Sequence, residues 1–125
     1  MVEIGKALRT VLDDEVNDFF FTLRSSLTWD VGLFATLEAA VYETLVELRG
    51  RRDVPRWIAG FFMNYLGAAV GIGQRADLLV VRDGVEVPDG SDVVSSACAR
   101  IKDYQHWLEA DELPFGSSVV YPRLD

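Results

Sequence analysis

The sequence predicts a mainly α-helical fold: about four helices packed as an irregular bundle, with one small β-hairpin. Apolar residues recur every three or four positions through most of the chain, which is the spacing of amphipathic helices. Two short β-branched runs flank Asp83-Gly84, a pair typical of a tight hairpin turn. The 125 residues are about one domain's worth of chain, so we expect a single helical domain over residues 1–125.

The first apolar series predicts either one long helix or two abutting helices. The acidic run at residues 13–18 is the expected joint between them, because it interrupts the helical spacing of apolar residues. The positions expected to face inward are Ile4, Leu8, Leu12, Val16, Phe19 or Phe20, Leu23 and Leu27.

The next helix is the most regular one. Thr28 or Asp30 is expected to cap its N-terminus, and Arg49 and Gly50 supply the cation and the glycine that commonly end a helix. Its inward stripe is Val31, Phe34, Leu37, Val41, Leu45 and Leu48.

A third helix is predicted with Asp53 as its cap and Pro55 in its first turn. It runs to about Val70, and Gly71 and Gly73 end it. Residues 57–73 carry no charge, but seventeen helical residues rise only ~26 Å against a hydrocarbon core of ~30 Å. We therefore interpret this stretch as a helix surrounded by protein and expect no association with a membrane.

The hairpin is followed by a last helix, which Ser91 or Asp92 is expected to cap and which fades near Glu112. Residues 117–122 could add a short strand. The inward positions of this helix are Val94, Ala97, Cys98, Ile101, Tyr104, Trp107 and Leu108.

The formal net charge of −8 is unevenly distributed along the chain. Residues 1–50 and 77–125 are acidic, whereas residues 51–76 carry four basic side chains and one acidic side chain. An acidic surface repels nucleic-acid phosphates and attracts cationic partners, so we expect a protein partner and no nucleic acid. The first residues lack the pattern of a secretory signal, which favours a cytoplasmic location.

Most catalytic templates fail on composition. One cysteine and one histidine exclude an intramolecular disulfide and a multi-histidine metal site. Residues 71–76 match the G-x-G-x-x-G/A string of dinucleotide-binding folds, but a helix precedes them and a β-like run follows, which reverses the required order. Asp103 and His106 share a helical face without a second such pair. We therefore expect no cofactor, no metal and no catalytic residue.

One enzyme alternative stays open. Glu15 and Asp18 form an E-x-x-D pair, and Glu43 and Glu47 lie one turn apart on the next helix, so four carboxylates could hold Mg²⁺ against a triphosphate. This pattern resembles the helical metal-dependent nucleotide pyrophosphatases, although only one of their two E-x-x-E/D motifs is present.

The surface favours a binding protein. Residues 19–21 are three consecutive phenylalanines that span ~200° of a helix, so one of them is expected to reach the surface. Aromatic anchors beside acidic groups are typical of a hot spot for a cationic protein. A subunit interface of an oligomer is a further alternative, and residues 49–56 are either an anion clamp or a basic cluster at a helix end. The residues predicted to bind the partner are Asp14, Glu15, Asp18, Trp107, Asp111 and Glu112.

Two strings, VPRWIAGFF at residues 54–62 and ARIKDYQHWLE at residues 99–109, resemble bacterial toxin-immunity proteins of the contact-dependent and polymorphic-toxin kind. The resemblance implies a small cytoplasmic, non-catalytic protein. Such a protein binds its cognate toxin, often a cationic nuclease, and neutralises it by occluding the active site or an exosite. The resemblance assigns no role to any single residue.

Overall fold

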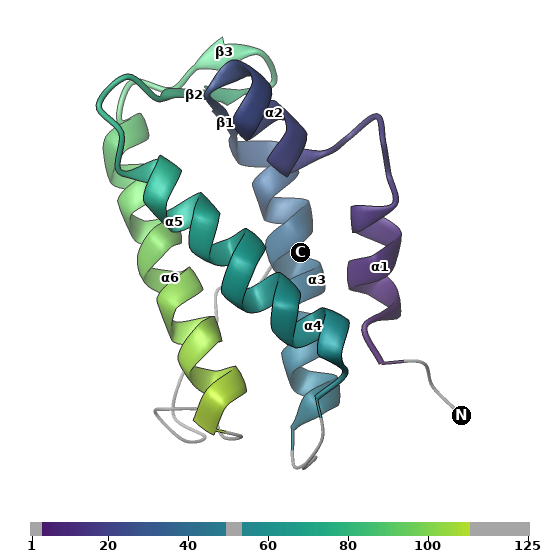
Figure 1. Cartoon of the computed structure of the whole chain (residues 1–125). Coiled ribbons are helices and arrows are strands. Elements are labelled where there is room, and N and C mark those ends of the chain that lie inside the picture. Colours follow the sequence, from purple (N-terminus) through teal and green to yellow (C-terminus); the bar gives the residue numbers. More distant parts are fainter. Residues whose placement is uncertain (1–3, 50–53, 111–125) are drawn as a thin grey trace.

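The computed structural model describes residues 4–49 and 54–110, which form helices around a central helix, with a small sheet at one end (Figure 1). This confirms a mainly helical fold with a small β element. The helices are α1 (Lys6–Leu12), α2 (Phe19–Ser26), α3 (Val31–Leu48), α4 (Arg56–Gly60), the π-helical η1 (Phe61–Leu66), α5 (Gly67–Gly73) and α6 (Gly90–Ala110). The strands are β1 (Thr28–Asp30), β2 (Leu79–Arg82) and β3 (Val85–Glu86).

The first apolar series forms two helices, α1 and α2, joined by the acidic run as expected. Asp18 caps α2, and its carboxylate accepts a hydrogen bond from the Phe21 amide at 3.1 Å. The expectation that Val16 faces inward is wrong: its side chain is 89% exposed. Val16 lies in the connecting turn, where the helical period no longer decides which way a side chain points.

Asp30 caps α3, because its Oδ1 accepts a hydrogen bond from the Leu33 amide at 3.0 Å. The alternative cap, Thr28, lies in β1 instead. The predicted stripe of α3 is buried from Phe34 to Leu48, with Val31 partly buried at its start. Figure 1 shows α3 at the centre of the molecule, with the helix of residues 56–73 crossing it between α1 and α6.

The third predicted helix is present, but its details differ. Pro55 is the N-cap residue rather than part of the first turn, and the expected cap Asp53 lies outside the described residues. The helix passes through Gly71 and ends at Gly73. Its middle section, η1, is a π-helix, which no periodicity in the sequence predicts. No described helix is both long enough and apolar enough to cross a membrane.

The predicted hairpin is present and belongs to a three-stranded sheet. β2 and β3 pair antiparallel, and the turn residues Asp83 and Gly84 have φ angles of 52° and 78°. β1 pairs with β2 in parallel, with Trp29 opposite Val80. The sequence analysis missed β1, because a three-residue strand next to a helix cap has no period of its own and forms through a distant partner.

α6 begins at Gly90, one residue before the expected caps, and its predicted inward positions from Val94 to Trp107 are buried. Gly90 allows a close approach to β2, since a Cβ there would lie 2.6 Å from Cβ of Val80. The expected end near Glu112 and the strand at 117–122 lie outside the described residues.

A buried polar cluster joins α3 to α6. Glu38 is 3% exposed and accepts hydrogen bonds from Arg100 Nε at 2.6 Å, Arg100 Nη2 at 3.1 Å and the Tyr104 hydroxyl at 2.7 Å. Three donors compensate the carboxylate for the water it loses, so the cluster fixes the register of the two helices.

Candidate interaction surface

Side chains of α2 and η1 form an aromatic surface over a shallow hollow of about 420 Å³. We define the aromatic surface by the residues that line this hollow. They are Asp18, Phe20, Phe21, Arg24, Ser25 and Tyr65.

The phenylalanine run supplies the α2 side of this surface. Phe19 and Phe20 are buried, whereas Phe21 is 67% exposed. This confirms the expectation that one ring of the three reaches the surface, because a helix cannot direct three consecutive residues inward.

The π-helical section supplies Tyr65, which is 44% exposed. Its ring lies edge-on to Phe20 at 5.4 Å between centroids and stacks with Phe61 at 5.9 Å. The Arg24 guanidinium lies 5.3 Å from the ring centroid, within the range of a cation–π contact. Packed on three sides, the Tyr65 ring is held in place before any partner binds.

A contact from α6 supports the π-helical geometry. Gln105 Nε2 donates a hydrogen bond of 2.9 Å to the carbonyl oxygen of Phe62. A π-helical turn displaces carbonyls from the regular i→i−4 ladder, and the amide gives this one a partner. π-helical turns are frequent at functional sites, and here the turn carries the exposed aromatic residue of η1.

An acidic turn adjoins the aromatic surface, and we define it as Asp13, Asp14, Glu15 and Asp18. Asp13 and Glu15 are exposed, and Asp14 Oδ1 accepts hydrogen bonds from the amides of Val16 and Asn17 at 3.0 Å each. The hydrogen bonds from Asn17 and Val16 hold the pKa of Asp14 below its ordinary value. Asp14 thus keeps its charge while its carboxylate also shapes the turn.

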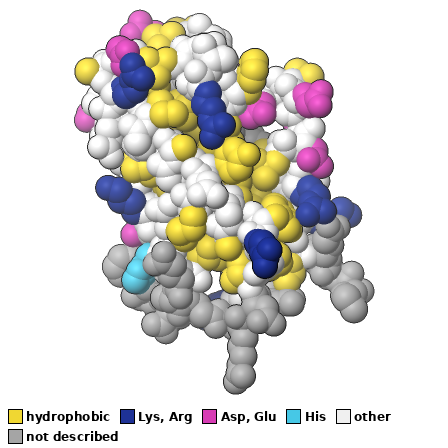
Figure 2. Space-filling view, viewed as in Figure 1, with side chains coloured by type: hydrophobic (Ala, Val, Ile, Leu, Met, Phe, Trp, Pro, Cys, Tyr) yellow, Lys and Arg dark blue, Asp and Glu magenta, His cyan; other side chains and the backbone are white. Residues whose placement is uncertain are grey.

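Figure 2 shows one face of the molecule, on which apolar side chains extend over the middle and the acidic ones gather towards the edges. Scattered single apolar residues are normal on a protein surface, whereas a continuous apolar area bordered by charges is typical of an interaction site.

The prediction that Trp107 centres a surface patch is wrong. Its side chain is 5% exposed and its ring lies 5.5 Å from that of Tyr104, within the stripe of α6 that faces the core. The helical period had already assigned it inward, and that signal was the stronger one. Asp111 and Glu112 lie outside the described residues.

Tyr65 is the surface residue that the sequence analysis missed. It lies within the uncharged run of residues 57–73, which we interpreted as surrounded by protein, and inside the π-helical turn, where side chains depart from the phase of an α-helix. No sequence signal marks this shift, because the bond that supports it comes from Gln105, forty-three positions from Phe62.

Two of the four carboxylates of the enzyme alternative have local structural roles. Asp18 caps α2, and Glu47 accepts a hydrogen bond of 3.0 Å from the amide of Gly5. Among the described residues, no group of three or more His, Cys, Asp or Glu side chains could hold a metal ion.

The basic stretch is only partly described. Arg49 and Arg56 are exposed at its two ends, whereas residues 50–53 lie outside the described residues. Whether this stretch holds an anion stays an open prediction.

The chain matches no protein-family model, and searches of curated proteins and of solved structures find no significant match.

Proposed function

We propose that this chain is a non-catalytic binding module that docks a cationic protein on its aromatic surface and acidic turn. In its biological setting it is an immunity protein, which neutralises a toxin domain by covering it. The observation that carries the proposal is that the exposed rings of Phe21 and Tyr65 line one hollow together with Arg24 and with Asp18 of the acidic turn.

The two parts of the surface have different tasks in this proposal. Aromatic and arginine side chains dominate binding hot spots, and aromatic rings bury large areas at little cost in conformational entropy. The carboxylates of the acidic turn steer a cationic partner to the surface and speed up the encounter. Binding to the Phe21 and Tyr65 rings then slows dissociation.

A photo-crosslinking experiment in cells tests the proposal. A photoreactive phenylalanine analogue replaces Phe21, and in a matched control it replaces Val85, which lies on β3 and is equally exposed at 69%. The expected result is one discrete adduct from position 21 with a basic protein, identified by mass spectrometry, and no such adduct from position 85. The proposal is wrong if both positions give the same adducts or if position 21 gives none.

With the partner purified, two variants separate the two tasks. Phe21→Ser is expected to increase the dissociation rate constant by about tenfold or more, whereas Glu15→Gln reduces mainly the association rate constant at low salt. Val85→Ser and Glu86→Gln, both at exposed positions of β3, are the controls. Equal effects of the site and control variants would contradict the assignment of this surface.

A further inference from the structure

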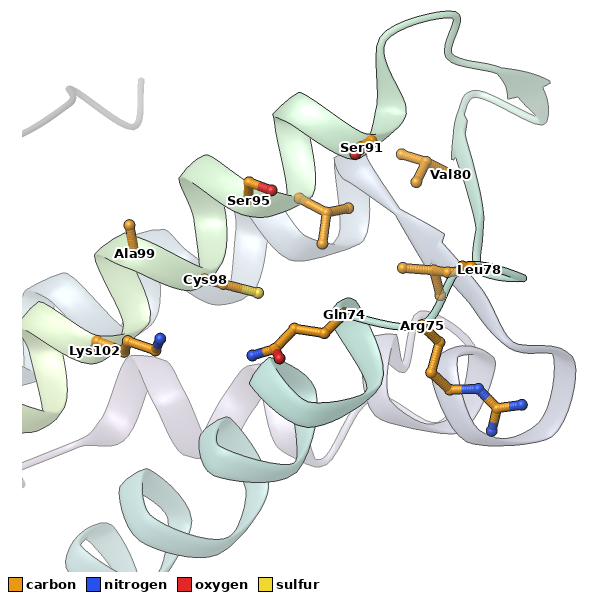
Figure 3. Close-up of a pocket in the computed structure, with 12 residues that line it drawn as sticks. Gln74, Arg75, Leu78, Val80, Ser91, Ser95, Cys98, Ala99 and Lys102 are labelled. Atoms are coloured by element: carbon orange, nitrogen blue, oxygen red, sulfur yellow. The ribbon is translucent and has the colours of Figure 1, made fainter.

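A second hollow in the described part of the molecule lies away from the aromatic surface, between the end of α5, β2 and α6 (Figure 3). It is a groove of about 520 Å³, within the usual size range of small-molecule sites. Its lining residues are Gly73, Gln74, Arg75, Ala76, Leu78, Val80, Ser91, Val94, Ser95, Cys98, Ala99 and Lys102.

The charge of the groove is opposite to that of the chain. The chain carries a net charge of −8, yet the charged lining residues are Arg75 and Lys102, and none of the carboxylates that the structure describes lines the groove. The guanidinium of Arg75 is held by Asp77 through two hydrogen bonds of 3.0 Å and points away from α6 in Figure 3. Lys102 is therefore the cation that the groove offers to a ligand.

The polar groups around Lys102 have free hydrogen-bonding capacity. The side chains of Gln74, Ser91, Ser95 and Lys102 form no hydrogen bond or ion pair with any residue that the structure describes. In Figure 3, the side chains of Gln74 and Lys102 extend towards the space in front of Cys98. An ammonium, an amide and hydroxyls are all donors that an anionic group can accept from.

The floor of the groove is apolar. Val80 and Val94 are buried, and Cys98 is 7% exposed with its sulfur directed at the end of α5. Burial raises the pKa of the Cys98 thiol, so the sulfur is a neutral, apolar part of this floor. The floor is fixed by close packing, because a Cβ on Gly73 would lie 2.9 Å from the Cys98 sulfur.

We propose that this groove binds a small organic anion with an apolar body, whose charged head contacts Lys102 and whose body lies over Val80, Val94 and Cys98. The cation and the donors at one end, with the apolar floor beside them, specify both parts of such a ligand. The proposal is independent of the docking surface, since the two share no residue.

Titration of the ¹⁵N-labelled protein with octanoate tests this proposal by NMR. Saturable shifts are expected at the amides of Gln74, Ser95 and Cys98, and no such shifts with octylammonium or with inorganic phosphate. Equal binding of octylammonium would show an apolar groove without charge selection, and equal binding of phosphate would show an anion site without an apolar part. Either result, or no saturable shift with octanoate, overturns the proposal.

Two variants with matched controls locate the ligand. Lys102→Gln is expected to weaken octanoate binding about tenfold, whereas Lys6→Gln on α1 leaves it unchanged. Ala99→Trp fills the groove and abolishes binding, whereas Ala35→Trp, at another exposed helical alanine, does not. Unchanged binding in both site variants would place the ligand elsewhere and overturn the proposal.

The single cysteine gives an independent readout. Octanoate at saturation is expected to slow the reaction of Cys98 with iodoacetamide, measured at alkaline pH because burial raises the pKa of this thiol and the thiolate is the reactive form. An unchanged reaction rate in the presence of bound octanoate would contradict a ligand that covers this sulfur.

Discussion

At the scale of single residues, Glu38 links two helices through its buried carboxylate. A carboxylate buried to 97% would be costly alone, but Arg100 and Tyr104 give it three hydrogen bonds from α6. A hydrophobic pair could replace the cluster without loss, whereas removal of one partner leaves the others buried and unmatched. The cluster therefore makes α3 and α6 dependent on each other.

We expect Glu38→Gln to lower the free energy of unfolding by about 2–4 kcal/mol, because the amide cannot satisfy both the guanidinium and the hydroxyl. Urea denaturation followed by circular dichroism measures this. Glu43→Gln, at an exposed position of the same helix, is the control and should change stability by less than about 0.5 kcal/mol. Equal stability of the two variants would contradict the role given to Glu38.

Tyr104 makes the free energy of unfolding depend on pH in the alkaline range. Burial, and then the hydrogen bond to Glu38, raise the pKa of Tyr104 well above its ordinary value of 10.0. The unfolded chain loses this proton near pH 10 and the folded chain keeps it, so the stabilisation is complete below pH 10 and is lost above it. We expect a loss of about 1.4 kcal/mol per pH unit above pH 10 from this group.

Urea denaturation between pH 9 and pH 11.5 tests this in the wild type and in two variants. Tyr104→Phe is expected to reduce the steepness of the alkaline decline, although it is less stable at neutral pH. Tyr65→Phe removes an exposed hydroxyl and should keep the full slope. An identical slope in all three proteins would refute the argument.

At the scale of elements, local backbone geometry and contacts between elements compete. The Asp83-Gly84 turn and the Asp30 cap follow from local chemistry, and both form as the sequence predicts. The strand β1 depends on β2, a partner far along the chain, and the Phe62 carbonyl of the π-helical η1 accepts a hydrogen bond from Gln105 on α6. The first kind of feature can be derived from neighbours in sequence, and the second kind cannot.

Two glycine-to-alanine substitutions test the local backbone requirements of a helix and of a tight turn. Gly71 lies inside α5 and Gly84 has a φ of 78° in the turn, and a Cβ meets no atom within 4 Å at either position. An added methyl group therefore fits equally well at both positions, and the backbone conformation alone decides the sign of the change in stability. We expect Gly71→Ala to raise the free energy of unfolding by about 0.5–1 kcal/mol and Gly84→Ala to lower it by about 1 kcal/mol.

Thermal or urea denaturation of the two alanine variants checks the signs. The same direction of change in both would contradict the backbone argument.

The helix cap is tested in the same way. Asp30→Ala is expected to lower the free energy of unfolding by about 1 kcal/mol, and Asp30→Asn is expected to restore it, because the amide oxygen can also accept the hydrogen bond from Leu33.

At the scale of the whole molecule, charge bears on the oligomer alternative. The net charge is −8, and the acidic turn adjoins the aromatic surface, so two copies that meet through this surface would repel each other. We expect a monomer of 14.0 kDa at low salt in light scattering coupled to size-exclusion chromatography. A stable dimer that Phe21→Ser dissociates would favour the subunit interface over the docking of a cationic protein.

The candidate surface was derived only in part from the sequence. The triple phenylalanine and the acidic run marked α2 and the turn before it, and Phe21 is exposed as expected. Trp107 was assigned to the surface because it adjoins acidic residues in sequence, but in a helix the burial of a side chain follows its angular position and not its neighbours. No pattern in the sequence predicts the groove beside Lys102, since its residues come from three separate elements.

The sequence by itself determined the helical class, the joint before α2, the capped start of α3 and the hairpin, because periodicity, caps and turn residues act within a few positions. Only the tertiary structure decided the parallel pairing of β1, the π-helical turn and the exposure of Tyr65. Those features exist because distant segments supply the missing hydrogen bonds and packing surfaces. Their free energy belongs to contacts between elements, which a local pattern of residues does not encode.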